Sequence, residues 1–303
     1  MAAKGVLSMD SYRLAQYAVQ VPCYICEGGN SFDSELCWHC HAPLVLAHQA
    51  KSAKVAPRMI AALGASGSGK TVYLGMLTDM LSHPRQPLQL TSRGAFSITL
   101  QQNTVAALQQ CRFPEKTPTE PDRWNWVHCQ VKQQKKNAQP VELIMPDVAG
   151  EALAEEIDHP GSFPVIQAFL GKCHGLFILA DASRMAEGNK DQDFFGMKML
   201  SYLSEMQENS RLGWSSKPIA VILSKADECE SCFEDPHTFT REHSPGIWHQ
   251  CEEHFSNYKM FATGVAGACA YRQHSHGSRL RVPLRVEPRG IIEPFEWLVQ
   301  KLN

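Results

Sequence analysis

The stretch RMIAALGASGSGKT, residues 58–71, decides the fold of this chain. Its first half is a short apolar run that ends in glycine, which is typical of a buried strand that enters a loop. Its second half matches the pattern G-x-x-x-x-G-K-[ST], and apolar residues at helical spacing follow to residue 83. A strand, this loop and a helix in that order predict a phosphate-binding loop, or P-loop.

The residue types of this loop fit a nucleoside triphosphate with Mg²⁺. Glycines let successive backbone N–H groups turn toward phosphate oxygens, and the start of the following helix adds its positive end. Lys70 would reach the β- and γ-phosphates, and the Thr71 hydroxyl would bind Mg²⁺. The alternative is a glycine-rich turn without chemistry, which the flanking strand and helix disfavour. We therefore expect the nucleotide-binding residues Gly64, Ala65, Ser66, Gly67, Ser68, Gly69, Lys70 and Thr71.

A second string, LIMPDVAGE at residues 143–151, places an aspartate at the end of another apolar run. Asp147 and Gly150 have the spacing D-x-x-G. A carboxylate in this position can hold the Mg²⁺ shell, and a flexible glycine can offer its N–H to the γ-phosphate. On its own, the string fits an ordinary strand-ending aspartate and turn glycine better, so its meaning depends on the other motifs.

A third string, ILSKAD at residues 222–227, bears on the choice of base. Asp227 could accept hydrogen bonds from N1–H and the 2-amino group of guanine, whereas adenine presents no such pair of donors. The stem of Lys225 could lie along the base plane beside the P-loop. On its own, a Lys-x-Asp string is usually the start of a solvated helix.

Near the N-terminus, four cysteines have the spacing C-x2-C-x10-C-x2-C: Cys23, Cys26, Cys37 and Cys40. Two such pairs can complete a tetrahedral Zn²⁺ site, and four cysteine ligands make that site structural, not catalytic. Free thiols or a disulfide are the alternative, which fits a reducing compartment less well. A further pair, Cys229 and Cys232, has no second pair in view, so we expect it to be unliganded.

The remaining apolar runs alternate between strand-like and helix-like stretches. This alternation predicts an α/β fold with a mostly parallel sheet and helices on both faces. WNWVHCQV and VELIMPD are predicted strands joined by the turn KKNAQP, and the polar, basic stretch 268–288 is predicted to be a loop. For the domains, we expect an N-terminal extension at 1–20, a zinc ribbon at 21–44, a linker at 45–56 and the nucleotide domain at 57–303.

The three strings occur in the order, and at the strand ends, found in P-loop GTPases. Residues 57–302 therefore resemble the translation-factor-like and Ras-like superclass. Within it, the cysteine module, the string DVAGE and the closing RGIIEPFEWLVQKL resemble the bacterial double-GTPases associated with conflict systems. The resemblance implies GTP or GDP as ligand, Mg²⁺ as cofactor, and catalytic positions at Lys70, Gly150 and Glu151.

The resemblance also implies a threonine in the first switch that completes the Mg²⁺ shell. Thr117 and Thr119 in EKTPTEP are the candidates, and we favour Thr119 because it follows a proline just before a predicted strand. Two departures from the family pattern stand out. Glu151 occupies the place of the glutamine that orients the attacking water, and a γ-phosphate would repel its carboxylate. The string FATGV lacks S-A-K, which leaves Ala262 and Thr263 as expected base-edge contacts.

Bulk composition argues against several classes of protein. The net charge is −2, with 44% hydrophobic and 20% charged residues, so no global basic field indicates nucleic acid or an anionic membrane. No apolar run approaches the roughly 20 residues of a membrane span, and the N-terminus lacks a signal-like apolar core. We expect a cytoplasmic protein. The cysteine module contains few Lys or Arg residues, which makes a protein partner or effector a better expectation than nucleic acid.

Together these observations predict a GTP-hydrolysing molecular switch that uses Mg²⁺ and carries a structural Zn²⁺. Two alternatives stay open. One is a GTP-dependent interaction protein with negligible intrinsic hydrolysis, which Glu151 favours. The other is a P-loop ATPase in which the SKAD string is accidental. The sequence does not indicate the oligomeric state.

Overall fold

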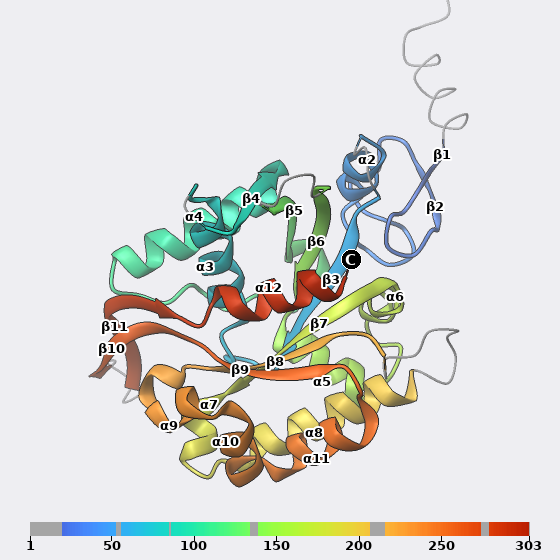
Figure 1. The fold of residues 1–303 in the computed structure, drawn as a ribbon. Helices are drawn as coiled ribbons and strands as arrows, with labels where there is room; N and C mark the ends of the chain where they lie inside the picture. The colour runs from blue at the N-terminus through green and yellow to red at the C-terminus, as the bar shows by residue number, and fades with distance from the viewer. Residues whose placement is uncertain are drawn as a thin grey trace, which may run out of the picture.

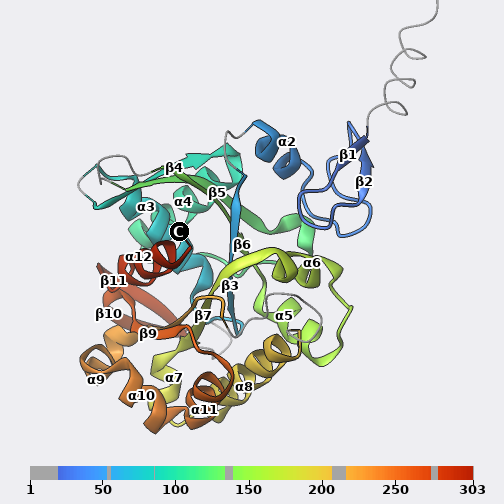
Figure 2. The same cartoon turned by 45° about the vertical axis from the view of Figure 1, so that its right-hand side comes forward.

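A seven-stranded sheet forms the centre of the protein (Figures 1 and 2). The computed structural model describes residues 20–52, 56–84, 86–133, 139–206, 216–273 and 279–302. In spatial order the strands are β4 (Leu88–Arg93), β5 (Asn125–Gln133), β6 (Val141–Asp147), β3 (Arg58–Gly64), β7 (Cys173–Asp181), β8 (Ile219–Ser224) and β9 (Tyr258–Ala262). Neighbours from β6 to β9 run parallel, whereas β5 is antiparallel to both β4 and β6. The expected α/β fold with a mostly parallel sheet is confirmed.

Helices cover both faces of the sheet (Figures 1 and 2). One face packs against α3 (Lys70–Ser82), α4 (Gly94–Gln109) and α12 (Ile292–Lys301). The other face packs against α5 (Gly150–Asp158), α6 (Pro164–Lys172), α7 (Ala182–Ala186), α8 (Lys190–Glu205), α9 (Glu230–Glu234), α10 (Pro236–His243) and α11 (Pro245–His254). Along β3, side chains alternate between the two apolar clusters: Met59 belongs to one and Ile60 to the other. Burial on both faces explains why these strands are continuous apolar runs.

The cysteine module joins the larger domain through a helix. It contains the short antiparallel pair β1 (Gln20–Pro22) and β2 (Gly29–Ser31), followed by α2 (Val45–Ser52). We expected residues 45–56 to be a linker, but the structure differs, because Leu46 and Ala47 of α2 are buried in the same apolar cluster as Met59. The Gln49 side chain also contacts His128 Nδ1 of β5 at 2.9 Å.

A two-stranded ribbon replaces the expected loop at 268–288. β10 (Gly264–Gln273) and β11 (Arg279–Arg289) pair antiparallel. Along the chain they follow β9 and precede α12. The string LRVPLRV alternates apolar and other residues, which is a strand signal that the basic residues and prolines obscured. The prolines are tolerated because each strand of a two-stranded ribbon has a free edge.

Some expectations fall on residues outside the described ranges. They concern the N-terminal extension up to residue 19, most of the KKNAQP turn, and residues 274–278 of the stretch expected to be a loop. In the parts of the chain that the structure describes, none of the helices combines the length and the apolar character that crossing a membrane requires.

Candidate functional site

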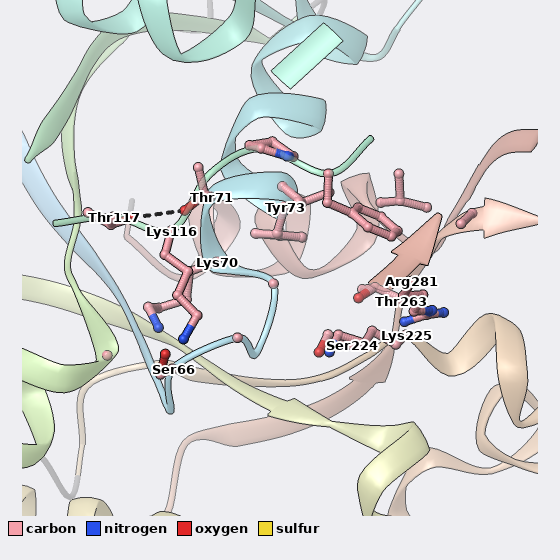
Figure 3. A pocket seen from close by; sticks show the side chains of 18 of the residues that line it. Ser66, Lys70, Thr71, Tyr73, Lys116, Thr117, Ser224, Lys225, Thr263 and Arg281 are labelled. Carbon is pink, nitrogen blue, oxygen red and sulfur yellow. Dashed lines mark hydrogen bonds between the residues drawn. The ribbon is translucent and has the colours of Figure 1, made fainter. Parts of the chain in front are cut away.

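A cavity of about 250 Å³ opens at the carboxyl ends of the central parallel strands (Figure 3). Its walls come from residues 66, 67, 69–73, 113–117, 148, 150, 151, 224, 225, 227 and 263–266, together with Arg281 and Ile291. Lys70, Thr71 and Thr117 lie toward one end, while Lys225, Thr263 and Arg281 lie toward the other (Figure 3). Segments far apart in the sequence therefore meet where ligands bind in open α/β sheets.

The P-loop begins where β3 ends and passes directly into α3. Gly69 precedes the helix with a φ of +88°, a left-handed conformation that glycine adopts without steric cost. The side chain of Lys70 is buried, and its Nζ donates hydrogen bonds to the carbonyl oxygens of Gly64 (2.7 Å) and Ala65 (2.9 Å). Burial lowers the pKa of Lys70 to about 8, although the nearby carboxylates of Asp147 and Glu151 oppose this shift.

Three oxygen-bearing side chains converge at the start of α3. Thr71 Oγ1 lies 3.0 Å from Thr117 Oγ1 and 3.2 Å from Asp147 Oδ1, and Thr117 Oγ1 donates to Asp147 Oδ2 at 3.0 Å. Asp147 is fully buried at the end of β6; burial raises its pKa, while Lys70 and the two hydroxyls lower it. Hydroxyl and carboxylate oxygens are the protein ligands that Mg²⁺ prefers, so these residues fit that ion.

The threonine of this cluster is not the one we favoured. Thr119 is exposed, whereas Thr117 contacts Thr71 and Asp147. The cause lies in the anchor of the loop: Trp124 is fully buried, and its Nε1 donates to the carbonyl oxygen of Pro118 at 2.9 Å. This bond fixes the chain just before Thr119 and leaves that residue on the solvent side.

Gly150 and Glu151 start α5 against the P-loop. A Cβ atom on Gly150 would lie 2.3 Å from the backbone N of Ser66, so no larger residue fits there without a shift of the loop. Glu151 Oε1 accepts a hydrogen bond from Ser66 Oγ at 2.5 Å and lies 3.4 Å from Lys116 Nζ. Partial burial would raise the pKa of Glu151, but these contacts with Ser66 and Lys116 outweigh it and lower the pKa. A carboxylate thus lies at the P-loop end of the cavity, where Ser66 and Lys116 donate hydrogen bonds to it.

The opposite end of the cavity carries the SKAD residues. Lys225 has a φ of +57°, a left-handed conformation that is uncommon for non-glycine residues. Its stem lines the cavity, and its Nζ pairs with Asp181 Oδ2 at 2.5 Å. Asp227 also lines the cavity, and the backbone of Gly264 packs so closely on it that a Cβ there would lie 2.8 Å from Asp227 Oδ1.

Of the two expected base-edge contacts, the structure brings only one to the cavity. Thr263 lines it, and its backbone is fixed by bonds with Leu223 O (2.8 Å) and Ala226 N (3.0 Å). Ala262 is the last residue of β9; it pairs with Leu223 in the sheet and its side chain belongs to the apolar core.

The family of the protein follows from residues 58–273, which match a family model described as Double-GTPase 2. The match covers more than half of the chain. The chain belongs to the double-GTPase 2 family. The resemblance to P-loop GTPases is therefore confirmed, and family membership supports GTP binding in this cavity. The matched segment begins with β3 and ends with β10, so the cysteine module, β11 and α12 of this double-GTPase lie outside it.

Solved structures give distant similarities to this double-GTPase. The small COPII coat GTPase SAR1 from Encephalitozoon cuniculi, in complex with GDP, is 13% identical over 81% of this chain and 80% of its own, with a TM-score of 0.39. A putative nucleolar GTP-binding protein 1 from Plasmodium falciparum is 12% identical over 83% of this chain and 89% of its own, with a TM-score of 0.37. The Ski7 GTPase-like domain from S. cerevisiae, bound to GDP and inorganic phosphate, is 14% identical over 80% of this chain and 49% of its own, with a TM-score of 0.42. No curated protein matches the chain.

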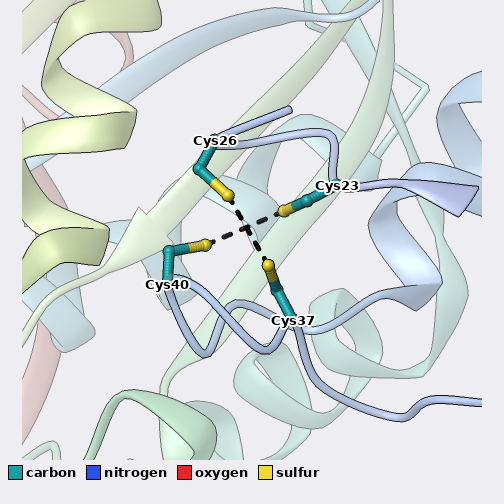
Figure 4. Close-up of side chains that lie close together, drawn as sticks. All are labelled: Cys23, Cys26, Cys37 and Cys40. Atoms are coloured by element: carbon teal, nitrogen blue, oxygen red, sulfur yellow. Dashed lines mark hydrogen bonds between the residues drawn. The ribbon is translucent and has the colours of Figure 1, made fainter. Parts of the chain in front are cut away.

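The double-GTPase also has a second candidate site, formed by the four N-terminal cysteines (Figure 4). Cys23 Sγ lies 3.8 Å from Cys40 Sγ, and Cys26 Sγ lies 3.5 Å from Cys37 Sγ. Four sulfurs around a tetrahedral Zn²⁺, each about 2.3 Å from the ion, would be separated by about 3.8 Å, so the spacing fits zinc and is too long for a disulfide. Within the described ranges, no other group of three or more His, Cys, Asp or Glu side chains could hold a metal ion.

Several residues that line the nucleotide site were not predicted from the sequence, and three of them matter most for its shape. Phe113 lies in an irregular proline-rich stretch, Ser224 is the last residue of β8, and Arg281 comes from the ribbon that we expected to be a loop. Only Ser224 carried a local signal, because it belongs to the S-K-x-D string itself. Its Oγ donates to the carbonyl oxygen of Ser68 at 2.7 Å, which ties the base-reading loop to the P-loop.

Proposed function

We propose that this protein is a GTP-hydrolysing molecular switch that works with Mg²⁺. The contact of Thr71, Thr117 and Asp147 carries the proposal. These residues belong to the P-loop helix, the loop before β5 and the end of β6, so one ion bound among them would link three segments. Loss of the γ-phosphate would weaken the hold on the loop that carries Thr117, which is how a nucleotide orders and releases a switch.

Guanine is the base that the cavity favours. Arg281 lies at the end away from Thr71 and Thr117 (Figure 3), and Asp227 contacts it there. A carboxylate in that place accepts the two neighbouring N–H donors of guanine. Thr263 and the stem of Lys225 add walls to that end of the cavity. The membership of the double-GTPase 2 family supports the same choice.

In the hydrolysis reaction, water attacks the γ-phosphorus and the bond from that phosphorus to the β–γ bridging oxygen breaks, which yields GDP and phosphate. Mg²⁺, when bound, neutralises charge on the β- and γ-oxygens. Lys70 would exchange the P-loop carbonyls for phosphate oxygens, and the N–H of Gly150 would donate to the γ-phosphate. Lys116 lies near enough to Glu151 to shield the γ-phosphate from its charge. Glu151 would then orient the attacking water.

The hydrogen bond between Ser66 and Glu151 favours a second candidate function. A carboxylate fixed on the P-loop opposes a γ-phosphate by charge repulsion, which would suit a GTP-dependent interaction protein with negligible intrinsic hydrolysis.

The cysteine module would hold a structural Zn²⁺ and contact a protein partner. Two large apolar side chains support this role because they are exposed on the module: Trp38 is 74% exposed and Phe32 is 56% exposed. Large apolar side chains exposed on one small module are compatible with an interaction site. The module has few basic residues, which disfavours nucleic acid as the partner.

Two measurements on the full chain test the proposal. Titrations with GTP, GDP and ATP, each with and without Mg²⁺, should show tight Mg²⁺-dependent binding of guanine nucleotides, and Lys70→Ala should abolish it in a folded protein. Single-turnover assays should then detect GTP cleavage that Glu151→Ala removes without loss of binding. Tight binding without cleavage above the rate of free GTP would support the second candidate, and equal affinity for ATP would overturn the GTP assignment.

A further inference from the structure

The ribbon β10–β11 brings a basic side chain into the base end of the cavity. Arg281 lies on β11 opposite Tyr271 of β10, and its side chain lines the cavity together with Phe113 and Asp227. The side chains of Arg281 and Asp227 are only 17% and 9% exposed. Arg281 also lies beyond residue 273, where the match to the family ends, so the contact belongs to a segment outside the family core.

Arg281 is held between two carboxylates and a ring. One guanidinium nitrogen, Nη2, lies 3.5 Å from Asp227 Oδ2 and 2.5 Å from Glu228 Oε1. Its Cζ atom lies 5.7 Å from the centre of the Phe113 ring, within the range of a cation–π contact. Neighbouring carboxylates repel each other, and the arginine between them offsets that repulsion at a site with little solvent.

The charge of Asp227 depends on what surrounds it. Its own segment contributes Lys225, Glu228 and Cys229, while the ribbon contributes Arg281 and the partly buried Cys269. Burial raises the pKa of Asp227; Glu228 raises it further, while Arg281 and Lys225 lower it. Lys225 is paired with Asp181, whereas Arg281 is in direct contact with the Asp227 carboxylate.

We propose that Arg281 is a positioning residue for base recognition, which holds the Asp227 carboxylate ready to accept the N1–H and 2-amino donors of guanine. The proposal rests on the proposed GTP site. A protonated or displaced Asp227 could not accept both donors, because a carboxylic acid turns one acceptor into a donor. Selectivity for guanine would then depend on a side chain that is 54 positions away in the sequence and outside the nucleotide motifs.

Base selectivity separates this role from a merely structural one. Guanosine diphosphate offers Asp227 two donors, whereas inosine diphosphate lacks the 2-amino group and offers one. Arg281→Ala should weaken GDP binding about tenfold, the usual size of a lost charge-assisted contact, and weaken inosine diphosphate binding less. Arg281→Lys keeps the charge and should restore most of the selectivity. The ratio of the two affinities does not depend on the folded fraction of a variant.

A matched control lies on the same strand. Arg285 is on β11, its side chain is 66% exposed, and it pairs with Glu287 instead of the cavity carboxylates. Arg285→Ala should leave both affinities within about twofold of the unchanged protein, as expected for an exposed ion pair.

The pH dependence gives a second readout. Guanine binding needs the ionised form of Asp227, so affinity for GDP falls as the pH drops through the pKa of that group. Without Arg281 this pKa rises, and the fall should begin at a higher pH in Arg281→Ala than in the unchanged protein or in Arg285→Ala.

Calorimetric titration of the full chain with the two diphosphates, at several pH values, performs the test. The inference alone would be overturned if the protein without substitutions prefers GDP and Arg281→Ala has the same ratio of GDP to inosine diphosphate affinity and the same pH profile. Tighter GDP binding in Arg281→Ala would also overturn it, because the arginine would then compete with guanine for Asp227. If the unchanged protein shows no guanine preference, the proposed GTP site fails and this inference fails with it.

Discussion

The side-chain oxygens of Thr71 and Thr117 lie 3.0 Å apart, although 46 residues separate the two positions in the chain. Thr71 is in the first turn of α3, and Thr117 belongs to the loop between α4 and β5. Both hydroxyls also contact the buried carboxylate of Asp147. The contact therefore closes the P-loop end of the cavity with a residue that belongs to an irregular, proline-rich stretch.

This contact makes Thr117 the threonine to test for Mg²⁺. Thr117→Ala should weaken Mg²⁺-dependent GTP binding by about tenfold or more, because Mg²⁺ loses an oxygen ligand and the loop loses a contact that orders it. The affinity for GDP should fall less. Thr119→Ala is the matched control: it is two residues away, exposed, and should behave as the unchanged protein. Mg²⁺ titrations at fixed GTP concentration measure both. A stronger defect in Thr119→Ala than in Thr117→Ala would contradict this assignment.

The lowered pKa of Lys70 predicts a pH dependence of nucleotide binding. Burial brings this pKa to about 8, so the side chain is charged below that pH and progressively neutral above it. Phosphates bind the charged form, so affinity should fall as the pH rises through 8, and binding near pH 9 should take up a proton. Calorimetry in two buffers of different ionisation enthalpy counts that proton. Uptake should disappear at about pH 6.5, and equal uptake at both pH values would contradict the role of Lys70.

Asp227→Asn should shift the base preference from guanine toward xanthine. Xanthine carries a carbonyl where guanine carries its amino group, and the asparagine amide can donate to that carbonyl. Loss of the charge-assisted pair of bonds should weaken GTP binding by about 2–4 kcal/mol. The ratio of GTP to xanthosine triphosphate affinity is the measurement, since misfolding would weaken both alike. A variant that still prefers guanine would show that Asp227 does not read the base.

Metal analysis of the purified chain should find about one zinc per molecule. Cys37→Ser should lose it, because the site would keep only three of its four sulfur ligands. Cys229→Ser provides the control, since Cys229 lies beside the nucleotide site and its sulfur contacts the Ala182 carbonyl at 3.7 Å. Full zinc content in Cys37→Ser, or its loss in Cys229→Ser, would place the ion elsewhere.

Residues 58–82 were the most predictable part of the molecule. The sequence pattern there is local: an apolar run, a glycine loop and a helix follow one another, and the structure has β3, the P-loop and α3 in those places. The strand Val141–Asp147 was predictable for the same reason, because its apolar run Leu143–Pro146 ends at a carboxylate.

Choices that depend on distant packing were not predictable. Thr117 and Thr119 are two residues apart in the same irregular segment, and only the buried position of Trp124 decides which one faces the cavity. α2 has an apolar face too short to stand out in sequence, and it forms because the core around Met59 covers Leu46. For Arg281, strand pairing in the ribbon brings it to Asp227, and no motif records that pairing.

The apolar cluster shared by the cysteine module and β3 has a consequence for the lifetime of the protein. Ile25 and Leu44 of the module pack in one cluster with Met59, and Tyr24 Oη donates to the carbonyl oxygen of Pro57 just before that strand. Loss of the proposed Zn²⁺ would loosen residues 21–44 and let water reach the strand that leads into the P-loop. Proteases recognise such opened segments, so metal supply, as well as nucleotide, would set how long a molecule survives in the cell.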